Sequence, residues 1–314
     1  MVLEIVALAG LEIAIAVSLL LSAGGLVDTP LLVAIVLCST SRGVLVPVLK
    51  DAGESSSAFG QLIIAGATVA DFGAIILLSL FFSGEGGTGA TLLLLGSLFA
   101  LGAVVLAVVR GAEHSMRIRA DLLRLQDTTA QIRVRAALVL FVGFAAVAEA
   151  LGPEVILGAF VAGAIVSLAD RDQAMTHPDF RRQLEAIGFG FFIPVFFVSS
   201  GVRFDLDALA ASAFSLLMVP VFLAALVATR SIPAVLYRTR LGTRKAAIAG
   251  LMQATSLPFI VASTAIGLEL GLIDAAGAAA LVGAGLLPVL LFPLVALTAL
   301  RQTAPPGALV TRPA

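Results

Sequence analysis

The sequence carries little charge. Asp, Glu, Lys and Arg fill only 12% of its 314 positions, whereas ordinary soluble domains have about 25%. Hydrophobic residues make up 60% of the chain, a composition typical of a membrane protein. The formal net charge of −1 gives no indication of a nucleic-acid partner.

Cysteine, histidine and tryptophan are also scarce. The single cysteine, Cys38, excludes an internal disulfide, and the absence of Trp leaves at most a weak aromatic belt. His114 and His177 both fall in basic connecting segments. The sequence shows no nucleophile–base pair and no metal-ligating cluster, so it predicts neither an enzyme nor a cofactor.

Long hydrophobic runs are abundant. Ten have membrane-spanning length, and in lipid each must be a helix because every backbone polar group needs a partner inside its own segment. They lie near 5–27, 30–49, 59–83, 89–110, 134–152, 153–169, 186–202, 208–237, 246–268 and 275–300. We expect an all-helical polytopic membrane protein with one transmembrane domain at 1–301 and a disordered cytoplasmic tail at 302–314.

Basic residues alternate between successive connections. Those near 110–135, 170–185 and 238–245 are rich in Lys and Arg, and those near 84–89, 152–154 and 268–275 have none. The positive-inside rule then predicts that both termini of this chain lie in the cytoplasm. We expect the membrane to be the plasma membrane. The stretch 117–133 is either a short interfacial helix or a solvated basic linker.

One carboxylate lies at the middle of a spanning segment. Asp71 is twelve residues from either end of segment 59–83, about 18 Å from each end of a helix. A carboxylate at that depth costs roughly 2.5–3.5 kcal/mol on insertion, so it is a functional candidate. Thr68 shares its helical face. The alternative is a buried Asp that only ties helices together.

Two spanning segments, 30–49 and 246–268, are interrupted near their midpoints by hydroxyl residues with a proline nearby. The residues concerned are Ser39, Thr40, Ser41, Arg42, Gly43 and Pro47 in the first, and Gln253, Thr255, Ser256 and Pro258 in the second. Hydroxyls compete for backbone bonds, and Gly and Pro weaken a helix. We predict two discontinuous helices, with kinked helices as the alternative. Their opposite directions across the membrane favour inverted repeats around a midplane site.

A buried cation is the last polar feature. Arg230 lies eight residues inside Arg238, about 12 Å deeper in the membrane. An uncompensated buried cation is costly, so Arg230 needs a partner. Candidates are Asp71, Glu149 or the carbonyl end of a half-helix.

Five stretches together resemble the monovalent cation:proton antiporter-2 family, which includes the Kef-type potassium/proton antiporters. In order they are "STSRGVLVPVLKDAG" at 39–53, "GQLIIAGATVADFGAIILLSL" at 60–80, "EALGPEVILGAFVAGAIVS" at 149–167, "FIPVFFVSSGVRFDL" at 192–206 and "RSIPAVLYR" at 230–238. The resemblance covers nearly the whole chain. It implies the sodium/proton exchanger fold, two crossing discontinuous helices and a homodimer in the lipid bilayer.

The resemblance also implies roles for residues. Asp71 corresponds to the carboxylate that binds the transported Na⁺ or K⁺ and the proton, with Thr68, Thr40 and Ser41 beside it. Ser39, Gly43, Thr255 and Ser256 correspond to the breaks in the crossing helices. Arg230 corresponds to the family's buried basic residue.

The sequence departs from the family in three ways. The family's first three transmembrane helices are not found, so the chain is expected to be short at its N-terminus. Ala70 stands where two-carboxylate members have Asp, which favours one-for-one electroneutral exchange. Arg42 is a second intramembrane cation, able to pair with Asp71 and exclude a cation.

The resulting hypothesis is secondary active transport. A monovalent cation and H⁺ exchange by competition at Asp71 with alternating access. Two alternatives stay open: an uncoupled cation pathway, and a non-transporting fragment of such an antiporter.

Overall fold

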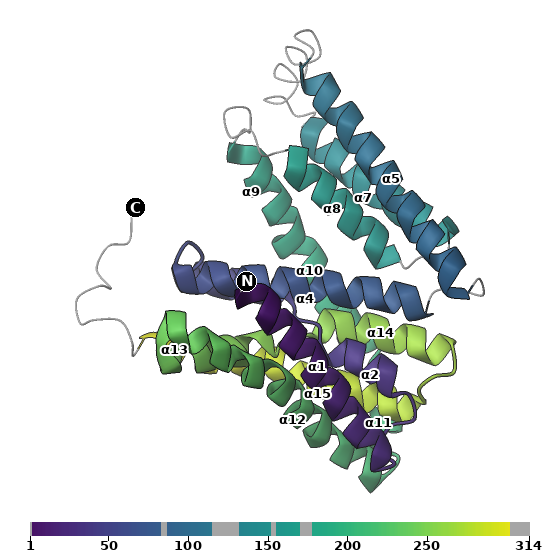
Figure 1. The fold of residues 1–314 in the computed structure, drawn as a ribbon, viewed down its shortest axis with the longest axis vertical. Helices are drawn as coiled ribbons and strands as arrows, with labels where there is room; N and C mark the ends of the chain where they lie inside the picture. The colour runs from purple at the N-terminus through teal and green to yellow at the C-terminus, as the bar shows by residue number, and fades with distance from the viewer. Residues whose placement is uncertain (1, 83–86, 115–131, 152–154, 170–177, 302–314) are drawn as a thin grey trace. The chain divides into compact units, whose positions relative to one another are not determined.

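The computed structural model describes residues 2–82, 87–114, 132–151, 155–169 and 178–301 (Figure 1). Every regular element among these residues is a helix, which confirms the all-helical prediction. The expected tail at 302–314 lies outside the described residues, and so does nearly all of the expected interfacial stretch at 117–133.

The helices follow one another with short connections. In chain order they are α1 (Val2–Ala23), α2 (Pro30–Leu37), α3 (Arg42–Asp51), α4 (Ala58–Phe82), α5 (Gly87–His114), α7 (Ile132–Leu151), α8 (Val155–Ala169), α9 (Pro178–Ile187), the π-helix η1 (Gly188–Phe192), α10 (Ile193–Val202), α11 (Leu206–Ala210), α12 (Ala213–Ala234), the 3₁₀ turn η2 (Val235–Tyr237), α13 (Arg238–Gln253), α14 (Leu257–Glu269) and α15 (Ala275–Arg301).

Seven stretches of the described chain are long and apolar enough to cross a membrane. They are Glu4–Ala23, Pro30–Asp51, Ala58–Phe82, Gly89–Gly111, Arg182–Val202, Ala213–Glu269 and Ala275–Leu300, and α8 is a shorter apolar helix. The stretch Ala213–Glu269 has 57 residues, far more than the roughly 20 that one crossing needs. Each of the ten expected segments coincides with helical residues. That ten segments cross the membrane stays a prediction.

The chain divides into two compact units. The first contains Met1–Ala74 and Phe197–Ala314, and the second contains Ile75–Phe196. In the second unit α8 packs on both α5 and α7. Gly158 permits the close approach of α7, because a Cβ there would come within 2.7 Å of the Ala148 side chain. Small residues at helix contacts are how membrane helices pack closely.

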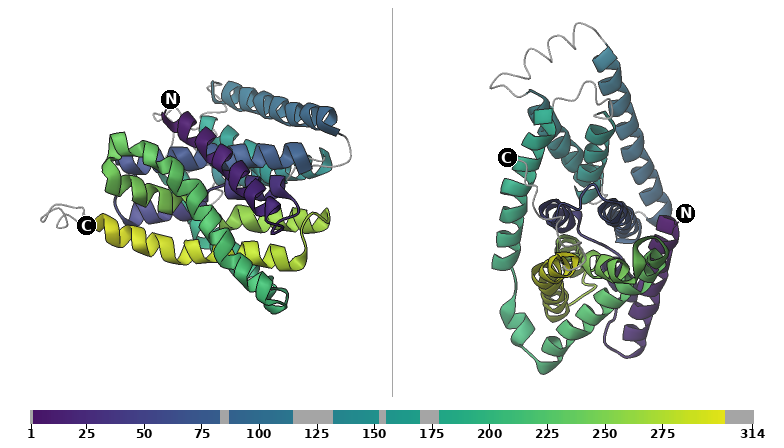
Figure 2. Two further views of the ribbon diagram at one scale, coloured as in Figure 1. Left: turned by 60° about the horizontal axis from the view of Figure 1, so that its bottom comes forward. Right: turned by 90° about the vertical axis from the view of Figure 1, so that its left-hand side faces the viewer.

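The first unit has its own hydrophobic core. Phe59 and Ile63 of α4, Leu45 of α3 and Tyr237 of η2 are almost completely buried there, together with residues of α13 and α15. Helix α12 packs on α1, α13 and α15, and α1 also lies against α2 (Figures 1 and 2). These contacts hold both interrupted segments, α2–α3 and α13–α14, inside one unit.

Large apolar side chains also cover the outside of the helices. Leu20 of α1, Leu93 of α5 and Leu290 of α15 are each more than 60% exposed. Such exposure is unfavourable in water and favourable against lipid chains, so it agrees with a multi-pass membrane protein.

Candidate functional site

The first interrupted segment breaks at residues 38–41. Helix α2 ends at Leu37 and α3 begins at Arg42, with Ser39, Thr40 and Ser41 between them. The hydroxyl of Ser39 donates to the carbonyl of Val36 at 2.8 Å, the local side-chain bond that competes with helix continuation. Gly43, which was expected at the break, lies inside the first turn of α3, so the break ends at Ser41.

The second interrupted segment breaks at residues 254–256. Helix α13 ends at Gln253 and α14 begins at Leu257, followed at once by Pro258. Proline is favourable in the first turn of a helix because its missing N–H would have no helical partner there. Thr255 donates its hydroxyl to the carbonyl of Met252 at 2.9 Å, so this hydroxyl also bonds to the end of the helix before it.

The two breaks meet and bond to each other. The backbone amide of Ser41 donates to the carbonyl of Thr255 at 2.6 Å. The hydroxyl of Thr40 donates to the carbonyl of Gln253 at 2.9 Å, and the hydroxyls of Ser39 and Ser256 share a hydrogen bond. All these side chains are buried. Each break therefore satisfies backbone groups that the other leaves without a helical partner, as burial in lipid requires.

The carboxylate of Asp71, in α4, contacts the first of the two breaks. Its Oδ1 accepts the backbone amide of Thr40 at 3.0 Å, and the backbone of Arg42 is a second hydrogen-bond partner of the same carboxylate. Arg42 is the first residue of α3 and Thr40 lies two residues before it, on either side of Ser41, which makes no side-chain cap. The free N–H groups and the helix dipole make such a start a favourable place for an anion.

The hydroxyls near the carboxylate donate their protons elsewhere. Thr68, one turn before Asp71, donates to the carbonyl of Ile64 at 2.7 Å in its own helix. Thr40 donates to Gln253 as described above. A hydroxyl that has donated its proton still carries oxygen lone pairs, which are what a monovalent cation binds.

Arg230 of α12 is buried, with 7% of its surface exposed. Its Nε and Nη2 atoms have no hydrogen-bond partner among the described residues. Cys38, Asp71 and Tyr237 are the titratable groups near enough to interact with it electrostatically, and of these Asp71 is the carboxylate. No ion pair within 4.0 Å joins Arg230 to Asp71 in the described chain, so the guanidinium acts on the carboxylate through space.

Arg42 is placed differently from the sequence hypothesis. Its side chain is exposed at the start of α3. The described residues show no ion pair between its guanidinium and Asp71; the contact is made by the Arg42 backbone. Glu149, the other partner considered for Arg230, lies in the second unit, whereas Arg230 lies in the first.

Sequence reasoning missed one buried residue of this region, Tyr237. It is fully buried in η2, and its hydroxyl accepts a long hydrogen bond of 3.5 Å from the Gln253 side chain. The backbone carbonyl of Gln253 also accepts the hydrogen bond from the Thr40 hydroxyl, so Gln253 connects Tyr237 to the two breaks. It is the one Tyr of the chain, and its position in an apolar segment was the available signal.

Comparison with known proteins fits this geometry. The family described as sodium/hydrogen exchanger, transmembrane, matches residues 2–300. YjbQ of Bacillus subtilis, whose name is that of an Na(+)/H(+) antiporter, is 34% identical over 82% of this chain and 41% of its own length. The Na(+)/H(+)-K(+) antiporter GerN of Bacillus cereus is 29% identical over 56% of this chain and 43% of its own. An Na(+)/H(+) antiporter of Enterococcus hirae is 31% identical over 54% of this chain and 43% of its own length.

The chain spans about two-fifths of the length of each of these three relatives. The family match, in contrast, runs through nearly all of the chain and includes both breaks, Asp71 and Arg230. On that match the chain belongs to the sodium/hydrogen exchanger family, whose members are membrane transporters and not a class of enzyme.

Proposed function

We propose that this chain exchanges a monovalent cation, Na⁺ or K⁺, for H⁺ across the membrane, with Asp71 as the group that holds either one. One observation carries the proposal. A single carboxylate, in the middle of an apolar helix, accepts a hydrogen bond from a backbone amide at the break of a second apolar segment. The family and the names of its relatives support the same activity.

The contacts of Asp71 suggest how the two ions compete. The amides of Thr40 and Arg42 support the carboxylate when it is ionised. Burial disfavours a bare negative charge, so the carboxylate either binds a cation in its ionised form or carries a proton in its neutral form. The lone pairs of Thr68, Thr40 and Ser41 would complete the cation's oxygen shell.

The positive charge of Arg230 acts electrostatically on the Asp71 carboxylate during this exchange. A buried guanidinium close enough to interact with Asp71, yet not paired with it, stabilises the ionised carboxylate at the moment when neither ion is bound. It also repels the incoming cation. We therefore assign Arg230 the role of setting how tightly the ionised site holds its cation.

The wider architecture is part of the proposal. We propose ten transmembrane spans forming inverted repeats, with 30–49 and 246–268 as the crossing helices and both termini of this chain in the cytoplasm. The assembly is a homodimer of the Kef-type antiporter-2 subfamily in the plasma membrane. The reciprocal bonding of the two breaks supports the repeats, and alternating access follows from rocking of the unit that carries them.

The decisive experiment is the Asp71→Asn variant in proteoliposomes with a trapped pH-sensitive dye. The amide oxygen of Asn retains an acceptor for the Thr40 amide but does not ionise, so we expect no Na⁺- or K⁺-driven proton movement. Asp207→Asn, at an exposed carboxylate of α11, is the matched control and should exchange normally.

The outcomes separate the alternatives. Cation flux without opposing proton flux in the unmodified chain would identify an uncoupled pathway. An unmodified chain that inserts but moves neither ion would be a non-transporting fragment. Exchange by Asp71→Asn at the unmodified rate would remove Asp71 from the role.

A further inference from the structure

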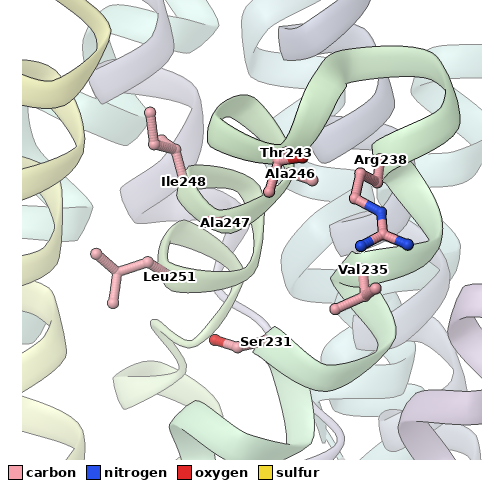
Figure 3. A pocket seen from close by; sticks show the side chains of 8 residues that line it. All are labelled: Ser231, Val235, Arg238, Thr243, Ala246, Ala247, Ile248 and Leu251. Atoms are coloured by element: carbon pink, nitrogen blue, oxygen red, sulfur yellow. The ribbon is translucent and has the colours of Figure 1, made fainter.

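A pocket lies between the end of α12 and the start of α13, in the first unit. Its volume is about 420 Å³, within the roughly 300–1,000 Å³ of small-ligand sites. Figure 3 shows the side chains that line it: Ser231, Val235, Arg238, Thr243, Ala246, Ala247, Ile248 and Leu251. None of the residues placed at the ion site lines this pocket.

Two glycines explain why the pocket is there. At Gly250 the helices touch, because a Cβ at this position would lie 2.7 Å from the Ser231 Cα and 2.9 Å from the Ala234 Cβ. At Gly242 the backbone turns with φ of 77°, and a Cβ there would meet nothing within 4 Å. The chain leaves along η2, turns at Gly242 and returns along α13, so a wedge opens away from the Gly250 contact.

The walls of the wedge are apolar and partly accessible. The Val235 side chain is 51% exposed and Ala247 is exposed, whereas Leu251 is half-buried and Ile248 is buried. All of them lie in the apolar stretch Ala213–Glu269. An open apolar wedge that faces a bilayer favours hydrocarbon as its occupant.

One positively charged side chain, that of Arg238, also lines the pocket. Arg238 is exposed, its guanidinium lies above Val235 in Figure 3, and it makes no ion pair within the described chain. Thr243 adds a hydroxyl to the lining. The neighbouring Lys245, in contrast, is engaged: its Nζ is 3.9 Å from Glu54 and 5.6 Å from the centre of the Phe59 ring. Arg240 is exposed but does not line the pocket.

We propose that this pocket binds one anionic phospholipid of the surrounding bilayer. The headgroup phosphate lies at Arg238 and Thr243, and part of an acyl chain lies along Val235, Ala247 and Leu251. Charge complementarity selects the occupant, because basic pockets between membrane helices on the cytoplasmic side bind acidic headgroups. A free phosphate ion would leave the apolar walls uncovered.

The test measures binding, independently of transport. The purified chain in neutral detergent is heated with dioleoyl-phosphatidylglycerol, with dioleoyl-phosphatidylcholine or with inorganic phosphate. We expect a saturable rise in Tm with phosphatidylglycerol, a much smaller rise with phosphatidylcholine and none with phosphate. Equal rises with both lipids, or the full rise with phosphate alone, would overturn the proposal.

Three variants locate the site. Arg238→Gln should weaken the phosphatidylglycerol response about fivefold, the effect expected for one basic residue at a lipid headgroup. Arg240→Gln, which changes an exposed arginine outside the pocket, should leave it unchanged. Ala247→Phe should abolish it by filling the wedge without altering charge. Equal losses in the two arginine variants would mean diffuse attraction, and an undiminished response in Ala247→Phe would also refute the site.

Each variant is first heated without lipid. A variant with an unaltered Tm in lipid-free detergent is folded, and its lipid response then decides the matter. Because Ala247→Phe and Arg238→Gln change the pocket in unrelated ways, the failure of one to fold leaves the other as the test. A negative result here would leave the assignment of Asp71 intact, since no residue is shared.

Discussion

Asp71 accepts the backbone amide of Thr40 at 3.0 Å although 31 positions separate the two residues. The bond places a carboxylate from α4 at the start of α3, where Ser41 provides no side-chain cap. A negative charge at this end of a helix is stabilising, and the stabilisation is lost when the charge is neutralised. In the proposed exchange, an ion or proton bound at Asp71 would therefore also change the charge beside the start of α3.

The Thr40 hydroxyl should contribute to stability independently of the ion. Thr40→Val keeps the shape and the amide bond to Asp71 but removes the donor to the buried carbonyl of Gln253. An unsatisfied buried acceptor costs about 1–3 kcal/mol, so we expect a lower Tm in thermal unfolding of the detergent-purified protein. Thr298→Val is the control, since that exposed hydroxyl bonds only within α15. Equal Tm values for the two variants would show that the Gln253 bond contributes nothing.

Removing the Arg230 charge should separate stability from function. Two of its nitrogens are buried without partners among the described residues, so Arg230→Met removes unsatisfied donors and should raise the unfolding free energy by about 1–3 kcal/mol. The rate of cation/proton exchange should fall because ionised Asp71 loses the nearby positive charge that stabilises it. Thermal unfolding and dye-quench exchange are measured on the same preparation. A destabilised variant would instead show that Arg230 is a structural partner in its own right.

Gly250 should tolerate no side chain. The Cβ of Gly250→Ala would press on the Ser231 backbone at 2.7 Å, and such overpacking costs about 1–3 kcal/mol. Gly96→Ala in α5 is the matched control, because its Cβ meets nothing within 4 Å. That variant should be more stable by about 0.5–1 kcal/mol, because alanine suits a helix interior better than glycine. The order of the two Tm values checks the prediction, and a Gly250→Ala protein as stable as Gly96→Ala would contradict it.

Local patterns in the sequence were sufficient to predict helices and to locate the polar interruptions of the two broken segments. They were not sufficient to predict partners. That Ser41 bonds to Thr255, or that Asp71 accepts a hydrogen bond from the Thr40 amide, depends on packing between residues far apart in the chain. Side-chain patterns led us to expect hydroxyls and Arg42 around Asp71, whereas the observed contacts are backbone amides, which no residue type reveals. The turn at Gly242 falls in the connection expected at 238–245, although the helix on either side of it was not foreseen there.

The reciprocal bonding of the two breaks has a consequence for how the protein is made. The hydroxyl of Thr40 and its acceptor on Gln253 are 213 positions apart. At ribosomal rates of roughly 5–20 residues per second, the first break waits about 10–40 s in the bilayer before its partner is synthesised. During that interval its polar backbone must be hydrated or held by an insertion factor. Substitutions in the second break should therefore lower the yield of inserted protein before they alter its activity.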